Sequence, residues 1–206
     1  MKCIKVIIAI LILACGAFLA YIYSGVDNVS ATAPEGFLTR WVLGTVRERS
    51  INTRIDTIQV PPLTDPKMIQ SGFAHYDALC SACHLKPGEK TSDLRAGLNP
   101  RPPALPRMAQ YVKPAKAFWI IKNGIRMTGM PAWGATQDDQ TIWNIVAFMQ
   151  KLPNMTAVKY QAMKQEANRT AAPSSLYTVL CKRPSKVTRH TVFELDSKSV
   201  QGGFPV

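Results

Sequence analysis

The feature that most constrains the fold is a run of five residues, Cys80-Ser81-Ala82-Cys83-His84. A C-x-x-C-H spacing is typical of covalent haem attachment. Each cysteine thiol can form a thioether with a vinyl group of the haem, and two intervening residues let both sulfurs reach the same porphyrin edge. The histidine that follows is then held beside the iron, where its imidazole can bind as the proximal ligand. Because the motif occurs once, we expect one covalent haem c, held by Cys80, Cys83 and His84.

Two other uses of paired cysteines fit the sequence less well. A redox dithiol would be expected beside a β-α-β pattern, and the sequence shows no such pattern. A tetrahedral zinc site needs further Cys or His ligands. The only other histidines, His75 and His190, have no second C-x-x-C near them.

The chain is strongly basic, with 25 Lys and Arg against 13 Asp and Glu and a formal net charge of +12. Such a balance first suggests nucleic-acid binding. However, the basic residues are spread along the chain without a run of five like charges. We therefore interpret the charge as a diffuse basic surface that faces anionic lipid or an acidic redox partner, and we expect no nucleic-acid partner.

Residues 1–23 are predicted to form a membrane anchor. An uncharged run of eighteen residues extends from Val6 to Tyr23, which just reaches the length of a membrane-spanning helix. A cleaved signal peptide would have a shorter apolar core. Residues 12–16 loosely resemble a lipobox with Cys15 as the lipidated residue, so cleavage and lipidation are the alternatives to an uncleaved anchor.

The charges around this segment predict its orientation. Lys2 and Lys5 precede the apolar run, and no Lys or Arg follows it until Arg40. The positive-inside rule then places the N-terminus in the cytoplasm and the bulk of the chain outside. We therefore expect a single-pass protein of a bacterial cytoplasmic membrane, with its haem domain in the periplasm.

Residues 24–62 are expected to be a linker that contains one amphipathic helix. Apolar residues recur at helical spacing from Phe37 to Val46, with arginines among them, and Pro34 suits the first turn. This helix can pack on the haem domain, lie at the membrane surface with its arginines toward lipid phosphates, or dock on a membrane subunit. Residues 51–60 partly alternate and are expected to form an extended connector.

Residues 63–153 are predicted to form a small all-α domain around the haem. The pair Asp65-Pro66 is typical of a helix start, and the helix should run to about Cys80. Gly72 lies on the same face as Cys80, and a glycine there lets a second helix cross closely.

Two further helices are expected in this domain. One should begin at Pro114 and stop at Gly124. The other should begin with a capping box of Thr136 and Asp139 and end at Pro153, and its apolar face should cross the first helix.

Residues 86–114 are rich in Pro, Gly and Lys and are expected to form a long loop around the haem edge. The stretch 101–106 is stiff because it contains three prolines. A carbonyl from this stretch could accept the second ring proton of His84, which would orient the imidazole and tune the iron.

A monohaem electron carrier needs a sixth iron ligand that stays bound in both redox states, and a methionine thioether does this while raising the potential. The chain has eight methionines, most of which should be core filler. Met130 is the first candidate because Gly129 and Pro131 beside it predict an irregular loop that presents the side chain. Met127 is the second candidate and Met108 the third.

Residues 154–206 are expected to form one short helix and a tail. Thr156 is expected to cap the helix, which should reach about Ala171. Beyond it we expect a basic, mostly flexible tail. Cys181, in an oxidising compartment, would be free or paired between chains.

These motifs together resemble those of class I c-type cytochromes, especially the membrane-anchored monohaem type of bacteria. The resemblance covers residues 65–153 and rests on four features: the Gly72-x-x-x-Tyr76-x-x-x-Cys80-x-x-Cys83-His84 helix, the Asn123-Gly124 turn, the Thr128-Gly129-Met130-Pro131 loop, and the aromatic helix that ends with Phe148 and Leu152. It implies a small all-α fold around one haem, with Cys80 and Cys83 as thioether attachments. It also implies that His84 and Met130 are the proximal and distal ligands of the iron.

The sequence therefore predicts an electron-transfer protein rather than an enzyme, because an iron with both axial positions filled has no open site for a substrate. It would pass electrons between a dehydrogenase or quinol-oxidising complex and an oxidase or reductase. One alternative is a cytochrome subunit of a periplasmic dehydrogenase or oxidase complex. Others are a haem enzyme in which Met130 is displaced and a haem-based sensor, although no output segment is visible.

Overall fold

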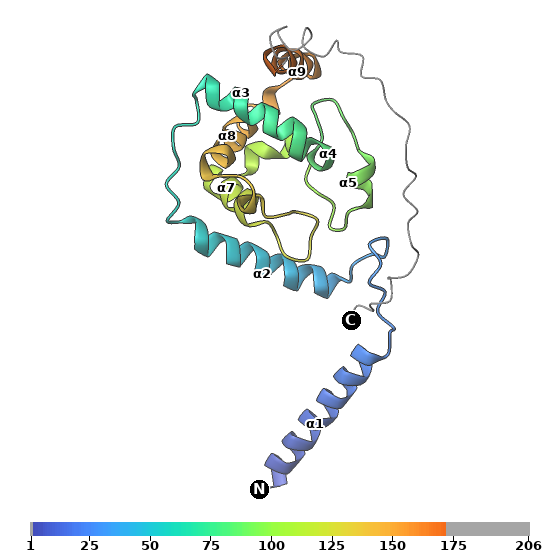
Figure 1. Ribbon diagram of the computed structural model, residues 1–206. Coiled ribbons are helices and arrows are strands. Elements are labelled where there is room, and N and C mark those ends of the chain that lie inside the picture. The colour runs from blue at the N-terminus through green and yellow to red at the C-terminus, as the bar shows by residue number, and fades with distance from the viewer. Residues whose placement is uncertain (1, 172–206) are drawn as a thin grey trace, which may run out of the picture. The chain divides into compact units, whose positions relative to one another are not determined.

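The computed structural model describes residues 2–171, and the regular structure in this range is entirely helical (Figure 1). This confirms the all-α class expected from the sequence. The α-helices are α1 (Lys2–Tyr23), α2 (Phe37–Ile55), α3 (Pro66–His75), α4 (Ser81–His84), α5 (Asp93–Gly97), α6 (Leu105–Met108), α7 (Pro114–Asn123), α8 (Asp139–Met149) and α9 (Ala157–Ala171). Short π or 3-10 turns lie at Tyr76–Cys80, Ala109–Tyr111, Trp133–Ala135 and Leu152–Asn154. The tail expected beyond residue 171, with Cys181, lies outside the described residues.

Within residues 2–171, α1 is the one helix long and apolar enough to cross a membrane. Its 22 residues extend about 33 Å at the usual rise of an α-helix. The hydrocarbon core of a bilayer is about 30 Å thick. No residue of α1 is buried against the rest of the chain, so its apolar side chains are available to lipid.

The two halves of α2 have different surroundings. In the first half Phe37 and Trp41 are 84% and 59% exposed, whereas Ile51 in the second half is only 2% exposed. The carboxylate of Glu48 forms an ion pair with the ammonium group of Lys116 in α7. The second half therefore packs on the helical domain, and the first half is uncovered.

The structure also corrects the predicted end of this helix. Residues 51–60 were expected to form an extended connector, but α2 continues to Ile55. Ile51 lies on the helix face that also carries Gly44 and Arg47. Burial of Ile51 against the domain stabilises the helical backbone there, and this tertiary packing outweighs the alternating sequence pattern.

The core of the domain forms where α3 crosses α8 (Figure 1). An ideal Cβ on Gly72 would lie 1.8 Å from the backbone oxygen of Asn144, so the crossing requires glycine, as the sequence indicated. Phe73 packs edge-on against Phe148 of α8 and Tyr160 of α9, with ring centroids 5.4 and 5.0 Å apart. All three rings are buried, and they join α9 to the core.

The helix starts agree only in part with the predicted caps. The carboxylate of Asp65 accepts a backbone N–H of the first turn of α3 at 2.8 Å, as expected. At α8, however, the cap is Asp138 and not Thr136, because Asp138 accepts the N–H of Thr141 at 2.7 Å. The turn Trp133–Ala135 comes first and moves the helix start further along the chain.

Two segments differ from their predicted boundaries. The first helix of the domain was expected to run without interruption to about Cys80, but α3 ends at His75 and a π turn, Tyr76–Cys80, precedes α4. Single π turns of this kind are frequent at functional sites. The loop 86–114, expected to be irregular, contains the short helices α5 and α6.

Candidate haem-binding site

The imidazole of His84 is already oriented by a hydrogen bond. Its Nδ1 lies 2.9 Å from the carbonyl oxygen of Pro103, and a carbonyl can only accept, so Nδ1 carries the ring proton. This leaves the lone pair of Nε2 free to bind a metal. The proline-rich loop therefore provides the acceptor that the sequence predicted.

The surroundings of His84 keep the ring neutral. Burial lowers the pKa of the imidazole, and the nearby charge of Arg95 acts in the same direction, although the hydrogen bond to Pro103 opposes both. The neutral imidazole is the form that coordinates metals. The lowered pKa therefore favours the form of the ring that can bind iron.

Helix α5 connects the haem-attachment motif to the proline-rich loop. The hydroxyl of Ser92, which caps α5, donates to the carbonyl of Ala82 between the two cysteines. Three residues later, Nε of Arg95 donates to the carbonyl of Pro102 at 3.0 Å. Neither contact was predicted from the sequence. Ser92 before Asp93 is a recognisable cap, but nothing in the sequence indicates the bond to Ala82.

The two cysteines occupy neighbouring positions at the junction of the π turn and α4. Cys80 is buried and Cys83 is half-buried, and neither forms a disulfide. Burial raises the pKa of the Cys80 thiol to about 12, and the nearby Cys83 adds to this shift. Positions three apart lie on one side of a helix, so both sulfurs can reach one edge of a flat cofactor.

A buried tyrosine fixes the chain directly after the motif. The hydroxyl of Tyr76 donates to the carbonyl of Leu85 at 2.7 Å. Leu85 has a φ of +71°, a left-handed conformation that non-glycine residues rarely adopt. Burial raises the pKa of Tyr76 well above its usual value, so the phenol remains a donor. This bond holds the sharp turn that follows His84.

Asp77 joins the π turn to α9, an element that lies late in the sequence. Its carboxylate accepts from the hydroxyl of Tyr160 at 2.8 Å. It also pairs with the ammonium groups of Lys164 and Lys86, at 2.8 and 3.5 Å. No local sequence pattern predicts this cluster, since its members are up to 87 residues apart.

The backbone of Met130 is fixed on both sides. Its N–H donates to the hydroxyl of Thr128 at 3.1 Å, and its carbonyl accepts from the N–H of Ile125 at 3.1 Å. The hydroxyl of Thr128 donates in turn to the carbonyl of Ile125 at 2.8 Å. The side chain of Met130 is half-buried and packs against the hydrophobic core.

The two other methionines considered as ligands lie in different surroundings. Met127 is 74% exposed and has a φ of +59°. Met108, at the end of α6, is also exposed. Of these three methionines, only Met130 packs against the core.

Gly124 shapes the start of the Met130 loop. Its N–H closes α7 by donating to the carbonyl of Ile120 at 2.8 Å, and its φ is +65°. An ideal Cβ would lie 2.7 Å from the carbonyl carbon of Pro131. Both observations explain why the helix stops where the sequence predicted.

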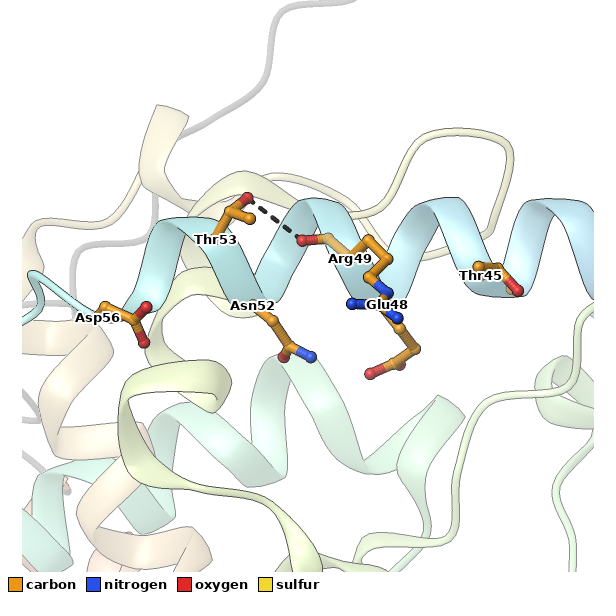
Figure 2. A pocket seen from close by; sticks show the side chains of 7 residues that line it. Thr45, Glu48, Arg49, Asn52, Thr53 and Asp56 are labelled. Atoms are coloured by element: carbon orange, nitrogen blue, oxygen red, sulfur yellow. Dashed lines mark hydrogen bonds between the residues drawn. The ribbon is translucent and has the colours of Figure 1, made fainter.

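Two hollows border α2. One hollow, of about 490 Å³, lies along the helix itself (Figure 2). It is lined by Gly44, Thr45, Glu48, Arg49, Asn52, Thr53 and Asp56. It contains none of the residues expected at the haem site. A second groove, of about 880 Å³, separates α2 from residues 99–101 and from a segment between α7 and Met130. Its lining also lacks Cys80, Cys83, His84 and Met130.

The donor set fits a covalent haem. Two thiols, a neutral imidazole with its Nδ1 satisfied, and a thioether in a fixed loop are the groups that such a haem requires. Residues 2–171 contain no group of three or more His, Cys, Asp or Glu that could hold a metal ion.

A family comparison covers this region. Residues 67–149 match the family model of subunit III of cbb3-type cytochrome c oxidase. The matched segment runs from α3 to the end of α8, so it contains Cys80, Cys83, His84 and Met130 but neither α2 nor α9. No curated protein matches the chain. Residues 67–149 are therefore similar to a cytochrome c domain that binds haem c covalently, and this similarity supports electron transfer as the function.

Proposed function

We propose that the chain is a one-electron carrier in which His84 and Met130 bind the iron of a single haem attached at Cys80 and Cys83. The observation that carries this proposal is the bond from His84 Nδ1 to the carbonyl of Pro103, 2.9 Å long. That bond leaves Nε2 of the ring free to bind the iron. The fixed backbone of Met130 adds support, since it limits where the thioether can go.

The residues expected around the haem have two roles: they bind the iron and they adjust its reduction potential. When bound, the haem supplies the reversible one-electron couple of its iron. His84 provides a neutral nitrogen donor whose basicity is raised by its bond to Pro103. Met130 would fill the remaining axial position, raise the potential and leave no open site for a substrate.

We further propose that α1 tethers this domain to the outer face of a bacterial cytoplasmic membrane. The length and apolar character of α1 support the tether, and the lysines before it support the orientation. At that surface the basic chain would meet acidic redox partners, taking electrons from a dehydrogenase or quinol-oxidising complex and giving them to an oxidase or reductase.

A second candidate function is that of a built-in subunit of an oxidase complex. The match of residues 67–149 to an oxidase subunit model favours it, as does the uncovered first half of α2, where Phe37 and Trp41 are exposed. Exposed apolar patches of this kind often mark interaction sites. Extraction in mild detergent followed by mass spectrometry separates the two functions. A stoichiometric oxidase subunit would identify a fixed subunit, and a protein that purifies alone would identify a tethered shuttle.

Carbon monoxide tests the carrier against a haem enzyme. A carrier with Met130 bound should give a six-coordinate, low-spin ferrous spectrum that does not change when carbon monoxide is added. Rapid binding of carbon monoxide would show an open or easily displaced position. That result would contradict the carrier and support catalysis or sensing.

A further inference from the structure

The charged side chains that line the groove of about 880 Å³ beside α2 are mostly positive. Its charged lining residues are five arginines and a single glutamate: Arg40, Arg47 and Arg54 from α2, Arg101 and Arg126 from the facing loops, and Glu35. The three arginines of α2 are seven residues apart, close to two helical turns. They therefore follow one line along the groove.

The wall that faces α2 belongs to the segments that fix the expected iron ligands. Thr128 lines the groove and hydrogen-bonds to the backbone of Met130. Arg101 also lines the groove and lies two residues before Pro103, the acceptor for His84. The groove therefore borders the two segments that support the expected ligands, although the ligands themselves do not line it.

The positive charge of the groove is poorly compensated. The two ion pairs of its α2 arginines, Arg40 with Glu35 and Arg47 with Glu48, are both 3.9 Å long and partly exposed. Within residues 2–171, no carboxylate lies within ion-pair distance of either loop arginine. A partly enclosed cluster of guanidinium groups attracts an anionic ligand.

Helix α2 also contacts the domain through residues other than these arginines. Ile51 is buried and also lines the groove. Glu48 pairs with Lys116 of α7. Helix α2 lies outside the segment that matches the oxidase subunit model, so its arginines are an addition of this chain to the matched domain.

We propose that the groove binds the propionate carboxylates of the haem, and that α2 thereby completes the haem site. Guanidinium groups bind carboxylates in a bidentate, charge-assisted manner, and the propionates are the only charged substituents of the porphyrin. The arginines offset the negative charge of the propionates and so favour the reduced iron. This proposal rests on the ligation by His84 and Met130 proposed above.

The test compares substitutions in the full-length protein in detergent. Arg47 is the least exposed of the three α2 arginines in the groove. Arg47→Gln should lower the reduction potential and shift the propionate bending bands in resonance Raman spectra. Arg47→Lys keeps the charge and should lower the potential less. Arg49→Gln makes the same charge change on the hollow of α2 shown in Figure 2, so it should leave both readouts unchanged.

Two results would overturn the proposal. One is an unchanged potential and unchanged Raman bands in Arg47→Gln. The other is an equal fall in Arg49→Gln, because the effect would then come from the net charge and not from the groove. Haem content and the thermal unfolding midpoint of each variant show whether the protein is intact.

A third measurement identifies the source of the anion. If the haem carboxylates fill the groove, no free anion can bind there. Added inorganic phosphate should then shift the reduction potentials of the wild-type protein and of Arg47→Gln by the same amount. A phosphate-dependent shift that requires Arg47 would show a free anion in the groove and overturn the proposal. If His84 and Met130 do not bind the iron at all, the wild-type protein would lack the spectrum of methionine-bound iron. That result can be told apart from a failure of the groove proposal alone.

Discussion

His84 and Met130 are both held by hydrogen bonds of the chain itself. The carbonyl of Pro103 orients the imidazole of His84, and Thr128 and Ile125 hold the backbone of Met130. If these residues bind the iron as proposed, their ordering by the chain would reduce the conformational entropy lost on binding. At the residue scale, the site therefore depends as much on the supporting groups as on the ligands.

The hydroxyl of Thr128 offers a direct test of this support. Thr128→Val keeps the side-chain shape but removes the bonds to Met130 and Ile125, which are 3.1 and 2.8 Å long. We expect a loss of about 1 to 3 kcal/mol in unfolding free energy, measured by denaturant titration. The control is Thr136→Val, since the hydroxyl of Thr136 is exposed and makes only a 3.4 Å bond. Equal losses in both variants would contradict a special role for Thr128.

At the scale of elements, the crossing of α3 and α8 determines where the motif of α4 lies. Ser71 and Gly72 meet Asn144 there, and the amide of Asn144 donates to the hydroxyl of Ser71 at 3.2 Å. The π turn and α4 continue directly from α3. A change at the crossing should therefore also shift the positions of Cys80 and Cys83.

Gly72→Ala tests the crossing. The added Cβ would overlap the backbone oxygen of Asn144, 1.8 Å away, and the resulting overpacking should cost at least about 1 to 3 kcal/mol. The matched control is Gly44→Ala in α2, where no atom lies within 4 Å of the added Cβ. Helix propensity should make that variant more stable, by about 1 kcal/mol. Similar unfolding midpoints for the two variants would be evidence against the close crossing.

The Asp77 cluster should make the contact between α9 and the π turn depend on pH. Burial alone would raise the pKa of this carboxyl, but hydrogen bonds from Lys164 and Tyr160 and the charge of Lys86 outweigh burial and hold the pKa below its usual value. A lowered pKa in the folded state stabilises the fold above the unfolded pKa. That contribution is lost as the pH falls through the folded value.

Asp77→Asn should therefore lower the unfolding midpoint at neutral pH and have little effect in strong acid, where the wild-type carboxyl is protonated. Circular dichroism melts across the acidic range measure this difference. Asp139→Asn, which breaks an exposed pair with Lys122, should cost less at neutral pH. A difference between Asp77→Asn and wild type that does not change with pH would contradict the role of the charge.

The sequence predicted the long elements better than the short ones. Strong local signals marked the start of α3 at Asp65 and the stop of α7 at Gly124, and both predictions are confirmed. Helices α5 and α6 have only five and four residues, which is too short for a periodic pattern to appear. Their existence depends on contacts with the rest of the domain.

The same distinction applies to the site. The attachment motif and a carbonyl acceptor in the proline-rich loop follow from local residue types. The contacts of Ser92, Arg95 and Asp77 do not, because their partners are set by the tertiary fold. The arginines of α2 belong to this second group, since the sequence could not show which face of the helix meets the domain.

At the scale of the whole molecule, the proposed anchor α1 would determine where the carrier works. We expect the protein purified from membranes to retain α1, Lys2–Tyr23, because its apolar length suits a spanning helix. Intact mass spectrometry measures this directly. Loss of about the first two dozen residues would show cleavage, and a mass increase at a new N-terminal Cys15 would show lipidation.

Ligation of the iron by Met130 is tested most directly by the absorption band that arises from charge transfer between a methionine sulfur and ferric iron. The wild-type protein and Met127→Ala should both show this band, whereas Met130→Ala should lose it and have a lower reduction potential. The opposite pattern, with the band lost in Met127→Ala and kept in Met130→Ala, would contradict ligation by Met130.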